Sequence, residues 1–248
     1  MNLAGKTAFV TGGGTGIGAA IALALAEQGA EVTITGRREG PLLEVADRSD
    51  RIRWALMDVL DEANVVGTIA DAGQIDIMVA NAGVAETQPL KRLTTDFWNR
   101  VIGTNLTGAM LCLRESVPQM AERGWGRAIV ISSVAGLNGF KYGGAYCASK
   151  FGAIGLVESV AAEFMTKGVT VNAICPGYVA TPIVDRGAAN ITAKAGLSDE
   201  AARQSLADLN PFARLITPEE VAASAVWLCG PGSGAVTGVA IPISGGPV

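Results

Sequence analysis

The sequence of 248 residues contains no histidine, and only 5% of its residues are aromatic. Histidine is the usual side chain for proton transfer near neutral pH, so any acid–base chemistry here needs other groups. Charged residues make up 17% of the chain, and the formal net charge is −4. General nucleic-acid binding requires a clustered basic face, which this balance argues against. We therefore expect no nucleic-acid partner.

Cysteine is also sparse. The four cysteines are scattered, without the spacing of a metal site or a disulfide framework: Cys112, Cys147, Cys175 and Cys229. Together with the lack of histidine, this predicts no bound metal. Scattered thiols fit a reducing compartment, and the first residues break into glycines after a very short apolar run, unlike a signal peptide. These features predict a cytoplasmic protein.

Charge is absent from residues 221–248, a length that could suggest a membrane segment. The same stretch holds six glycines and three prolines, which would disrupt a spanning helix. It predicts instead a short helix, a turn and a buried strand, with no membrane partner. An uncharged segment of this length also indicates that another subunit covers it.

What the sequence does contain is a regular alternation of short β-branched runs and longer helical patterns. Strands are expected at residues 7–11, 31–35, 52–57, 75–80, 127–132, 169–174 and 239–242. Helices are expected at residues 16–28, 41–48, 62–72, 96–123, 144–166 and 218–228. Most strand candidates are continuous apolar runs, as in a parallel sheet covered on both faces. This predicts an α/β, doubly wound (Rossmann-type) fold with a seven-stranded parallel sheet.

We expect one dinucleotide-binding and catalytic domain over residues 1–248. Residues 181–215 depart from the alternation and carry weak helical patterns at 183–189 and 199–209. We expect this insertion, called the lid segment below, to form a small variable cover over the substrate.

A glycine-rich turn follows the first expected strand and opens the first helix. The stretch VTGGGTGIG includes Gly12, Gly16 and Gly18. Glycines let the backbone approach a pyrophosphate, and the helix N-terminus offers free N–H groups and a favourable dipole. The spacing is wider than G-x-G-x-x-G, and no Gly-Lys-Ser/Thr follows. A tight turn needing positive φ is the alternative, but the strand–turn–helix context favours a nucleotide.

The end of the second expected strand bears on the choice of nucleotide. Dinucleotide sites usually carry an acidic residue about 20 positions after the turn. Gly36 stands near that position, followed by Arg37 and Arg38. A guanidinium can hold a 2′-phosphate with two donors, so the pair favours NADP(H). In the alternative, both arginines are solvated, Glu39 holds the ribose and the cofactor is NAD(H).

The segment AYCASK places Tyr146 and Lys150 four residues apart, and two such side chains share one face of a helix. A free tyrosine has a pKa of about 10, and a nearby ammonium lowers that pKa. The pair can therefore take the part of a histidine in proton transfer. From these six residues alone, an ordinary helix surface remains the alternative.

Other polar residues lie where ligands bind in such a fold. Ser132 and Ser133 end one expected strand and Asn81 ends another, at the edge where parallel strands have their carboxyl ends. Asn105 lies inside an expected helix between two glycines, and asparagine is unfavourable there. This position predicts a bent helix with a free carbonyl.

Taken together, these motifs resemble the short-chain dehydrogenase/reductase family over nearly the whole chain. The matching elements, in order, are TGGGTGIG, DV (Asp58, Val59), NAG (residues 81–83), Asn105, SS before YCASK, and PGYVAT (residues 176–181). The resemblance implies a hydride transfer between NAD(P) and a secondary alcohol or ketone. It implies four catalytic residues: Tyr146 as general acid/base, Lys150 as ribose ligand that lowers the tyrosine pKa, Ser133 orienting the substrate oxygen, and Asn105 holding a relay water.

The resemblance also implies the cofactor contacts. They are Gly12, Thr15, Gly16, Ile17 and Gly18 in the turn, Arg37 and Arg38, Asp58 and Val59 at the adenine, Asn81, Ala82 and Gly83 on the ribose side, Tyr146 and Lys150, and Pro176, Gly177, Val179 and Thr181, the last at the nicotinamide amide. Relatives that choose NADP(H) often carry a basic residue in the glycine loop, where this chain has Thr15. The NADP(H) preference therefore depends on the two arginines.

The substrate is the least determined feature. We expect Leu137, Asn138, Phe140, Tyr142, Ile183 and Leu197 to line its pocket, which suggests a largely apolar ketone. Arg186, Lys194 and Arg203 either grip the phosphates of a 3-oxoacyl thioester or form a solvated helix face. A dinucleotide-binding regulator without turnover and an isomerase or lyase are the other functions that such a fold allows.

The expected helices at residues 96–123 and 144–166 carry more apolar and small residues than one sheet face can cover. In relatives, helices of this kind pack across a twofold axis. With the uncharged C-terminal segment, this predicts a homotetramer.

Overall fold

The computed structural model describes residues 2–247, and in this range seven parallel strands form one sheet in the order β3-β2-β1-β4-β5-β6-β7. The strands are β1 (Thr7–Thr11), β2 (Glu31–Gly36), β3 (Ile52–Leu56), β4 (Ile77–Ala80), β5 (Gly126–Ile131), β6 (Val169–Pro176) and β7 (Ala240–Ile243). The doubly wound, seven-stranded parallel fold is thus confirmed. The chain winds outward from β1 to β3 and then returns to β4 on the other side of β1. Such a reversal is a switch point, where ligands bind at the carboxyl ends of the strands.

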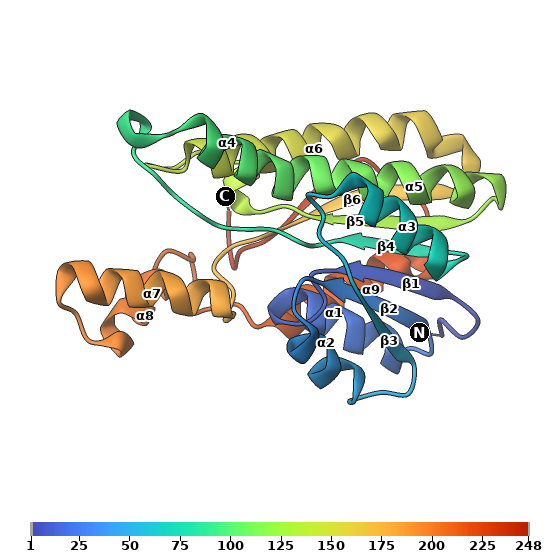
Figure 1. Ribbon diagram of the computed structural model, residues 1–248, viewed down its shortest axis with the longest axis horizontal. Coiled ribbons are helices and arrows are strands. Elements are labelled where there is room, and N and C mark those ends of the chain that lie inside the picture. The colour runs from blue at the N-terminus through green and yellow to red at the C-terminus, as the bar shows by residue number, and fades with distance from the viewer. Residues whose placement is uncertain (1, 248) are drawn as a thin grey trace.

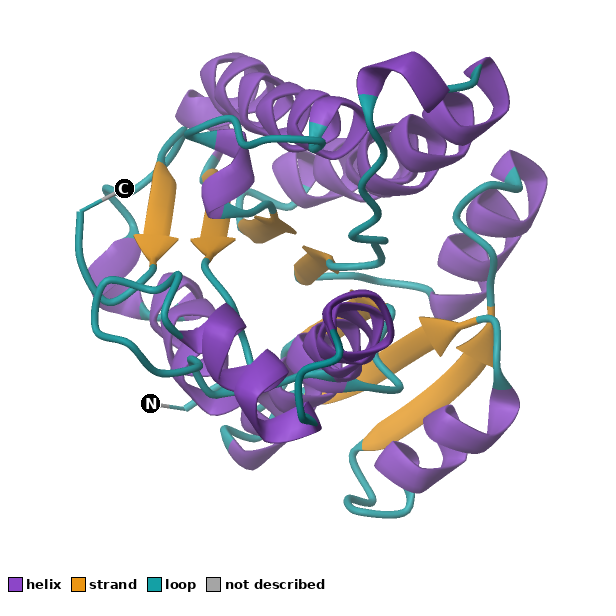
Figure 2. Cartoon of the chain, turned by 90° about the vertical axis from the view of Figure 1, so that its left-hand side faces the viewer, coloured by secondary structure: helices purple, strands orange, loops and turns teal. Residues whose placement is uncertain are grey.

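Helices cover both faces of this sheet (Figures 1 and 2). One face carries α3 (Glu62–Ala72), α5 (Gly108–Glu122) and α6 (Gly144–Phe164), and the other carries α1 (Gly16–Glu27), α2 (Glu39–Ala46) and α9 (Pro218–Cys229). Apolar strand residues point to both sides: Ile34 joins the core on the α1 side, and Met78 joins the core on the α5 side. Covering both faces explains why the strands are continuous apolar runs.

The expected helix over residues 96–123 is continuous but irregular. The structure has α4 (Thr95–Ile102), a π-helical turn (Gly103–Thr107) and then α5. A Cβ atom on Gly103 would lie 2.8 Å from Leu60, and one on Gly108 would lie 2.8 Å from Val59. The two glycines therefore let the segment after β3 approach the helix backbone. The irregularity expected around Asn105 takes the form of this π-helical turn, a feature that is frequent at functional sites.

The lid segment contains α7 (Pro182–Ala195) and α8 (Asp199–Ala207), which stand apart from the sheet beyond β6 (Figure 1). The first is longer than expected. Pro182 starts it at a position where proline is favoured, and Gly196 ends it with φ of 68° in the left-handed region. Short 3₁₀ turns complete the elements: Leu90–Arg92, Val134–Gly136, Met165–Lys167 and Pro231–Ser233.

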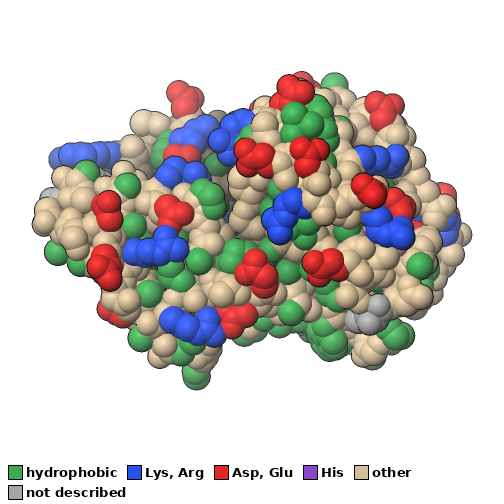
Figure 3. Space-filling model, turned by 90° about the horizontal axis from the view of Figure 1, so that it is seen from below, with side chains coloured by type: hydrophobic (Ala, Val, Ile, Leu, Met, Phe, Trp, Pro, Cys, Tyr) green, Lys and Arg blue, Asp and Glu red, His purple; other side chains and the backbone are tan. Residues whose placement is uncertain are grey.

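The surface gives two further observations. Across residues 2–247, every helix is too short or too polar to span a membrane. On the face drawn in Figure 3, acidic and basic side chains are interspersed.

Candidate active site

The switch point is held together by hydrogen bonds between the ends of β1 and β4. The Thr11 hydroxyl accepts from the N–H groups of Asn81 (3.0 Å) and Ala82 (2.9 Å). The Asn81 amide in turn donates to the main-chain oxygens of Thr11 (2.8 Å) and Gly12 (3.2 Å). The glycine turn and the NAG segment, about 70 residues apart in the chain, therefore form one rigid edge.

The glycine turn is shaped by close backbone approaches. Gly12 and Gly16 have φ of 65° and 55°, which favours glycine. A Cβ atom on Gly18 would overlap the main-chain oxygen of Gly12 and lie 2.5 Å from the Asn81 amide nitrogen. Thr15 is exposed before α1, and Ile17 is half-buried in its first turn. The turn thus presents bare backbone at a helix N-terminus, which fits the pyrophosphate of a dinucleotide.

The end of β2 lies beside this turn. Arg37 and Arg38 are exposed, and Arg37 lies 4.0 Å from the carboxylate of Asp58, with 67% of its side chain exposed. A Cβ atom on Gly36 would make only ordinary contact, 3.6 Å from Leu42. Packing therefore does not require glycine there, and its absent side chain leaves room beside the two cations. The buried Thr35 hydroxyl has no partner among the described residues.

Val59 is buried after β3, whereas the Asp58 carboxylate accepts from the N–H of Leu60 (3.0 Å). Of the two residues implied at the adenine, Val59 is therefore packed in the core, whereas the Asp58 carboxylate is partly solvated.

Ser133 and Tyr146 meet beyond β5. Ser133 directly follows Ser132 at the end of the strand, and its hydroxyl accepts from the N–H of Ala135 (3.1 Å). Tyr146 lies in the first turn of α6, and a hydrogen bond with Ser133 lowers the pKa of its phenol. Burial is the larger effect and raises that pKa overall. The phenol is therefore held in its protonated form near neutral pH.

Lys150 lies one helical turn further along α6 and is only 5% exposed. Its ammonium donates to the main-chain oxygen of Ile131 (2.8 Å) and lies 5.8 Å from the centroid of the Tyr146 ring. Burial lowers the pKa of Lys150 to about 8. Burial of the phenol raises the pKa of Tyr146 overall, and the Lys150 ammonium, which the resemblance implies would lower that pKa, donates to a main-chain carbonyl.

Asn105 is buried in the π-helical turn and its side chain is fully engaged. Its oxygen accepts from the N–H of Val84 (2.8 Å), and its amide donates to the oxygen of Val84 (2.9 Å) and to Ser149 (3.0 Å). Ser149 in turn donates to the main-chain oxygen of Tyr146 (2.7 Å). The Asn105 side chain therefore ties the NAG loop to α6, so a water there would have to be held by its main-chain carbonyl.

The segment after β6 closes the site against the glycine turn. Thr181 is buried, and its Cγ2 atom would lie 3.0 Å from a Cβ atom on Gly16. Its hydroxyl donates to the main-chain oxygen of Val179 (3.2 Å). Pro176 ends β6, and Gly177 donates its N–H to Ile243 in β7 (2.9 Å). The implied cofactor residues from four parts of the chain thus lie along one edge of the sheet.

The substrate side is bordered by the loop before α6. Phe140 packs edge-on against Tyr146, with ring centroids 6.3 Å apart. Tyr142 has φ of 69°, a strained conformation for a bulky residue, and its carbonyl accepts from the N–H of Gln88 (2.9 Å). In the lid segment, Ile183 and Leu197 are exposed. An aromatic ring thus borders the phenol, and the lid segment carries exposed aliphatic side chains.

At least one of the basic side chains of the lid segment is already paired with a carboxylate. Arg203 pairs with Asp185, joining α8 to α7. Arg186 lies near Glu86, whose carboxyl is already held by Arg100 through two hydrogen bonds of 2.5 and 2.8 Å. The side chain of Lys194 lies outside the described part of the chain.

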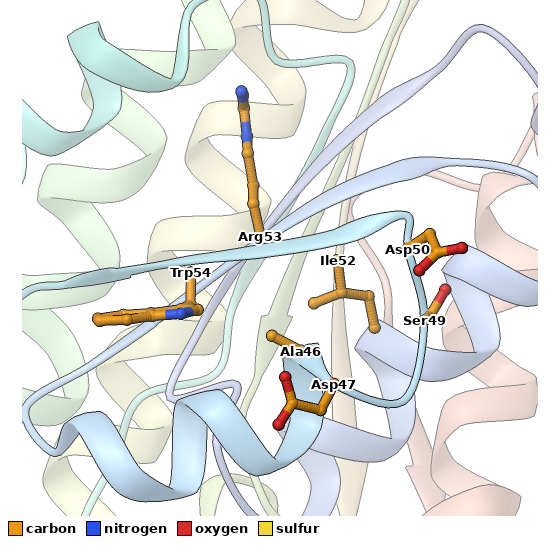
Figure 4. A pocket seen from close by; sticks show the side chains of 7 residues that line it. All are labelled: Ala46, Asp47, Ser49, Asp50, Ile52, Arg53 and Trp54. Atoms are coloured by element: carbon orange, nitrogen blue, oxygen red, sulfur yellow. The ribbon is translucent and has the colours of Figure 1, made fainter.

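A separate hollow lies at the other end of the sheet, between α2 and the start of β3 (Figure 4). It is lined by Ala46, Asp47, Ser49, Asp50, Ile52, Arg53 and Trp54. The guanidinium of Arg53 is engaged by the Thr33 hydroxyl (2.7 Å) and the Ala72 carbonyl (2.9 Å). Because this hollow is at the amino end of β3, it is not part of the candidate site.

Sequence reasoning missed several residues that shape the site. Thr11 and Ser149 lie inside the quoted motifs, so a buried hydroxyl in each motif was an available signal. Cys175 lies beside Ser132 and Lys150, and burial raises the pKa of its thiol. Asn210 binds the backbone of Tyr178 across 32 residues. No local pattern marks Asn210, because its partners are distant in the sequence.

The buried ammonium of Lys150 predicts a stability cost. Its pKa is about 8 in the folded protein, below the unfolded value of 10.5, so folding opposes protonation. The full cost applies below pH 8 and disappears as the pH rises to the unfolded value. Because the substitution also loses the Ile131 hydrogen bond, we expect Lys150→Met to raise the free energy of unfolding at pH 7 by about 1–2 kcal/mol.

Urea unfolding at pH 7 and pH 10 checks this prediction. The advantage of Lys150→Met over the parent should shrink at the higher pH. Lys91→Met, at an exposed lysine, is the control and should show no such change. An advantage that is independent of pH would contradict the prediction.

Known proteins share this fold and these motifs. Residues 6–191 match the family model described as short chain dehydrogenase. A D-beta-hydroxybutyrate dehydrogenase from Rhizobium meliloti (strain 1021) is 34% identical, covering 97% of this chain and 98% of its own. A 3-oxoacyl-[acyl-carrier-protein] reductase from Vibrio harveyi is also 34% identical, covering 99% of this chain and 98% of its own.

Among solved structures, an actinorhodin polyketide ketoreductase with NADPH superimposes with a TM-score of 0.93 at 31% identity, covering 97% of this chain and 96% of its own. Since the family model and these relatives match most of the chain, the protein belongs to the short-chain dehydrogenase/reductase family and is an oxidoreductase that acts on hydroxyl and keto groups with NAD(P).

Proposed function

We propose that the protein interconverts a largely apolar ketone and its secondary alcohol, with NADP(H) as the preferred cofactor. The observation that carries this proposal is the convergence of Ser133, Tyr146, Lys150 and Asn105 at one edge of the sheet. A regulator that only bound the dinucleotide would have no use for a half-buried proton donor beside a serine hydroxyl.

Each residue has a distinct task in this proposal. The cofactor supplies or accepts the hydride when bound. Tyr146, protonated near neutral pH, donates its phenolic proton to the ketone oxygen, and Ser133 donates a hydrogen bond to the same oxygen. Lys150 binds the ribose hydroxyls, and a cation near the phenol favours loss of its proton. The main-chain carbonyl of Asn105 holds the water through which the phenol regains a proton.

Because the pKa of Tyr146 is raised, ketone reduction and alcohol oxidation depend on pH in opposite ways. Ketone reduction uses the phenol, which predominates near neutral pH. Alcohol oxidation needs the phenolate, so its rate should increase as the pH rises.

Two observations support an apolar substrate. Phe140 borders the phenol, and Tyr142 in the same loop and Ile183 and Leu197 in the lid segment are exposed apolar side chains. Because Arg203 is paired within the lid, a phosphate grip on a 3-oxoacyl thioester would depend on Arg186 and Lys194. We therefore rank a simple apolar ketone above a coenzyme A thioester, although relatives named for 3-hydroxybutyrate and 3-oxoacyl chemistry keep the thioester in the test panel.

The proposed preference for NADP(H) predicts that loss of Arg37 and Arg38 weakens NADPH binding. Arg37 and Arg38 provide the cations beside the vacant side-chain position of Gly36, whereas Asp58 is the competing acid. We expect the parent to bind NADPH more tightly than NADH. The double variant Arg37→Ala/Arg38→Ala should lose about 10-fold or more in NADPH affinity, because charge-assisted hydrogen bonds to the 2′-phosphate disappear.

Fluorescence titration with both reduced cofactors measures this preference. The double variant should keep its NADH affinity, since the remaining contacts do not involve the 2′-phosphate. Equal or tighter binding of NADH by the parent would show that NAD(H) is the cofactor instead.

Replacing the proton donor gives the direct test of catalysis. Tyr146→Phe should lower turnover by at least ~100-fold while leaving cofactor affinity and the melting temperature near those of the parent. Ser133→Ala should lower turnover with little effect on cofactor affinity. Cofactor oxidation over a panel of apolar ketones and 3-oxoacyl thioesters is the assay. A parent that binds NADPH and turns over none of them would favour the regulator.

We also infer a homotetramer, because two separate parts of the surface carry exposed aromatic residues. Trp98 in α4 and Phe151 in α6 are exposed on one face of the sheet, and Trp227 in α9 is exposed on the other, with Val239 exposed before β7. Two different self-complementary interfaces generate a tetramer with three twofold axes. Light scattering at micromolar concentration should give four chains of 25.3 kDa. Trp227→Glu should give a dimer, and a monomeric parent would refute the assembly.

A further inference from the structure

Asn210, at the end of the lid segment, is 2% exposed and uses both ends of its amide. Its oxygen accepts from the N–H of Tyr178 (2.9 Å), and its nitrogen donates to the carbonyls of Tyr178 (2.9 Å) and Arg214 (2.7 Å). One side chain thus satisfies three main-chain groups from two segments. Buried polar groups without such partners are costly, so this clamp strongly disfavours separation of the segments.

The clamp lies where the lid segment both begins and ends. The N–H of Ala180 donates to the oxygen of Ile216 (2.8 Å), and the N–H of Ile216 donates to the oxygen of Tyr178 (3.0 Å). Any side chain at Gly177 would overlap the Asn210 amide oxygen. The two ends of the lid segment, called the hinge below, therefore form one hydrogen-bonded unit with Asn210 at its centre.

The chain must turn sharply to place Asn210 there. Ala213 has φ of 53°, a left-handed conformation that favours glycine, and its N–H donates to the main-chain oxygen of Asn210 (2.8 Å). A strained conformation persists only where its surroundings fix it. Both the side chain and the main chain of Asn210 therefore take part in fixing the hinge.

We propose that Asn210 is a positioning residue for the nicotinamide end of the cofactor, an inference that rests on the proposed function. It holds the backbone at Tyr178, next to Val179, whose carbonyl accepts the hydroxyl of Thr181. Thr181 in turn packs against Gly16 of the glycine turn. Without the clamp, residues 176–181 lose their fixed distance from that turn, while the adenosine end, bordered by Arg37 and Asp58, keeps its structure.

Asn172 in β6 provides a matched control for Asn210. Asn172 in β6 is 1% exposed, its amide donates to the oxygen of Val236 (2.9 Å), and its oxygen accepts from the N–H of Val239 (3.3 Å). It is also a buried asparagine whose amide binds main-chain groups, but both groups belong to the one segment just before β7. Its loss should destabilise the fold without moving residues 176–181.

The experiment compares Asn210→Ala and Asn172→Ala with the parent by calorimetric titration of NADPH and of 2′,5′-ADP, which lacks the nicotinamide half. Asn210→Ala should weaken NADPH binding by about 10-fold or more, because residues 176–181 must then be ordered around the nicotinamide half at a cost in binding free energy. Its affinity for 2′,5′-ADP should stay within about twofold of the parent, since the phosphate contacts are retained. Asn172→Ala should lower the melting temperature and leave the ratio of the two affinities unchanged.

If Asn210→Ala does not fold, Asn210→Asp replaces it, because this variant keeps the acceptor for Tyr178 and loses the donor to the two carbonyls. The same selective loss of NADPH affinity is expected. An unchanged affinity ratio in the folded Asn210 variant, or an equal change in Asn172→Ala, would overturn the role of Asn210. A parent that binds neither ligand would overturn the proposed NADP(H) preference, on which this inference rests.

Discussion

The hydrogen bonds between Thr11 and Asn81 close the gap at which the sheet reverses its direction of winding. Parallel strands leave their last N–H and C=O groups unpaired at this edge, and these groups require partners wherever they are buried. Thr11 supplies one acceptor for two N–H groups, and Asn81 supplies the return donors. The glycine turn can therefore lie bare against the NAG segment, with Gly18 packed on the junction. The helix N-terminus that would receive the pyrophosphate gets its position from this junction.

A second set of contacts extends the same edge to the chemical groups. Asn105 links the NAG loop to Ser149, and Ser149 links to the backbone of Tyr146. Lys150 reaches back to the end of β5 through the Ile131 carbonyl. These links fix the phenol and the ammonium on separate partners while keeping them on one helix face. Burying both groups lowers stability, as the shifted pKa of Lys150 indicates, and a catalytic site commonly accepts such a cost.

The fold and the order of the motifs were predictable from the sequence, because alternation of strands and helices is a local pattern. The same holds for the shared face of Tyr146 and Lys150, since helix geometry sets it. The direction of the Tyr146 pKa was not predictable from the pair, because desolvation depends on packing from several elements. The π-helical turn likewise depends on contacts of Gly103 and Gly108 with the segment after β3. The role of Asn210 was not predictable for the same reason, because its partner Tyr178 lies 32 residues away in the sequence.

Exposed charges form one end of the candidate cofactor site, and buried hydrogen bonds and packing form the other. The two ends therefore differ in how well they tolerate substitution. At the adenosine end, Arg37 is 67% exposed and its contact with Asp58 spans 4.0 Å, so this ion pair contributes little to stability. Substitutions there can alter phosphate recognition without disturbing the fold. At the nicotinamide end, residues 176–181 are held by β6, by packing on Gly16 and by the buried Asn210 amide. A side chain at Gly177 would overlap the Asn210 amide oxygen, and loss of Asn210 would leave main-chain groups of Tyr178 unpaired. Under the proposed function, cofactor choice is therefore separable from the geometry of hydride transfer, because within residues 2–247 Arg37 and Arg38 share no hydrogen bond with residues 176–181.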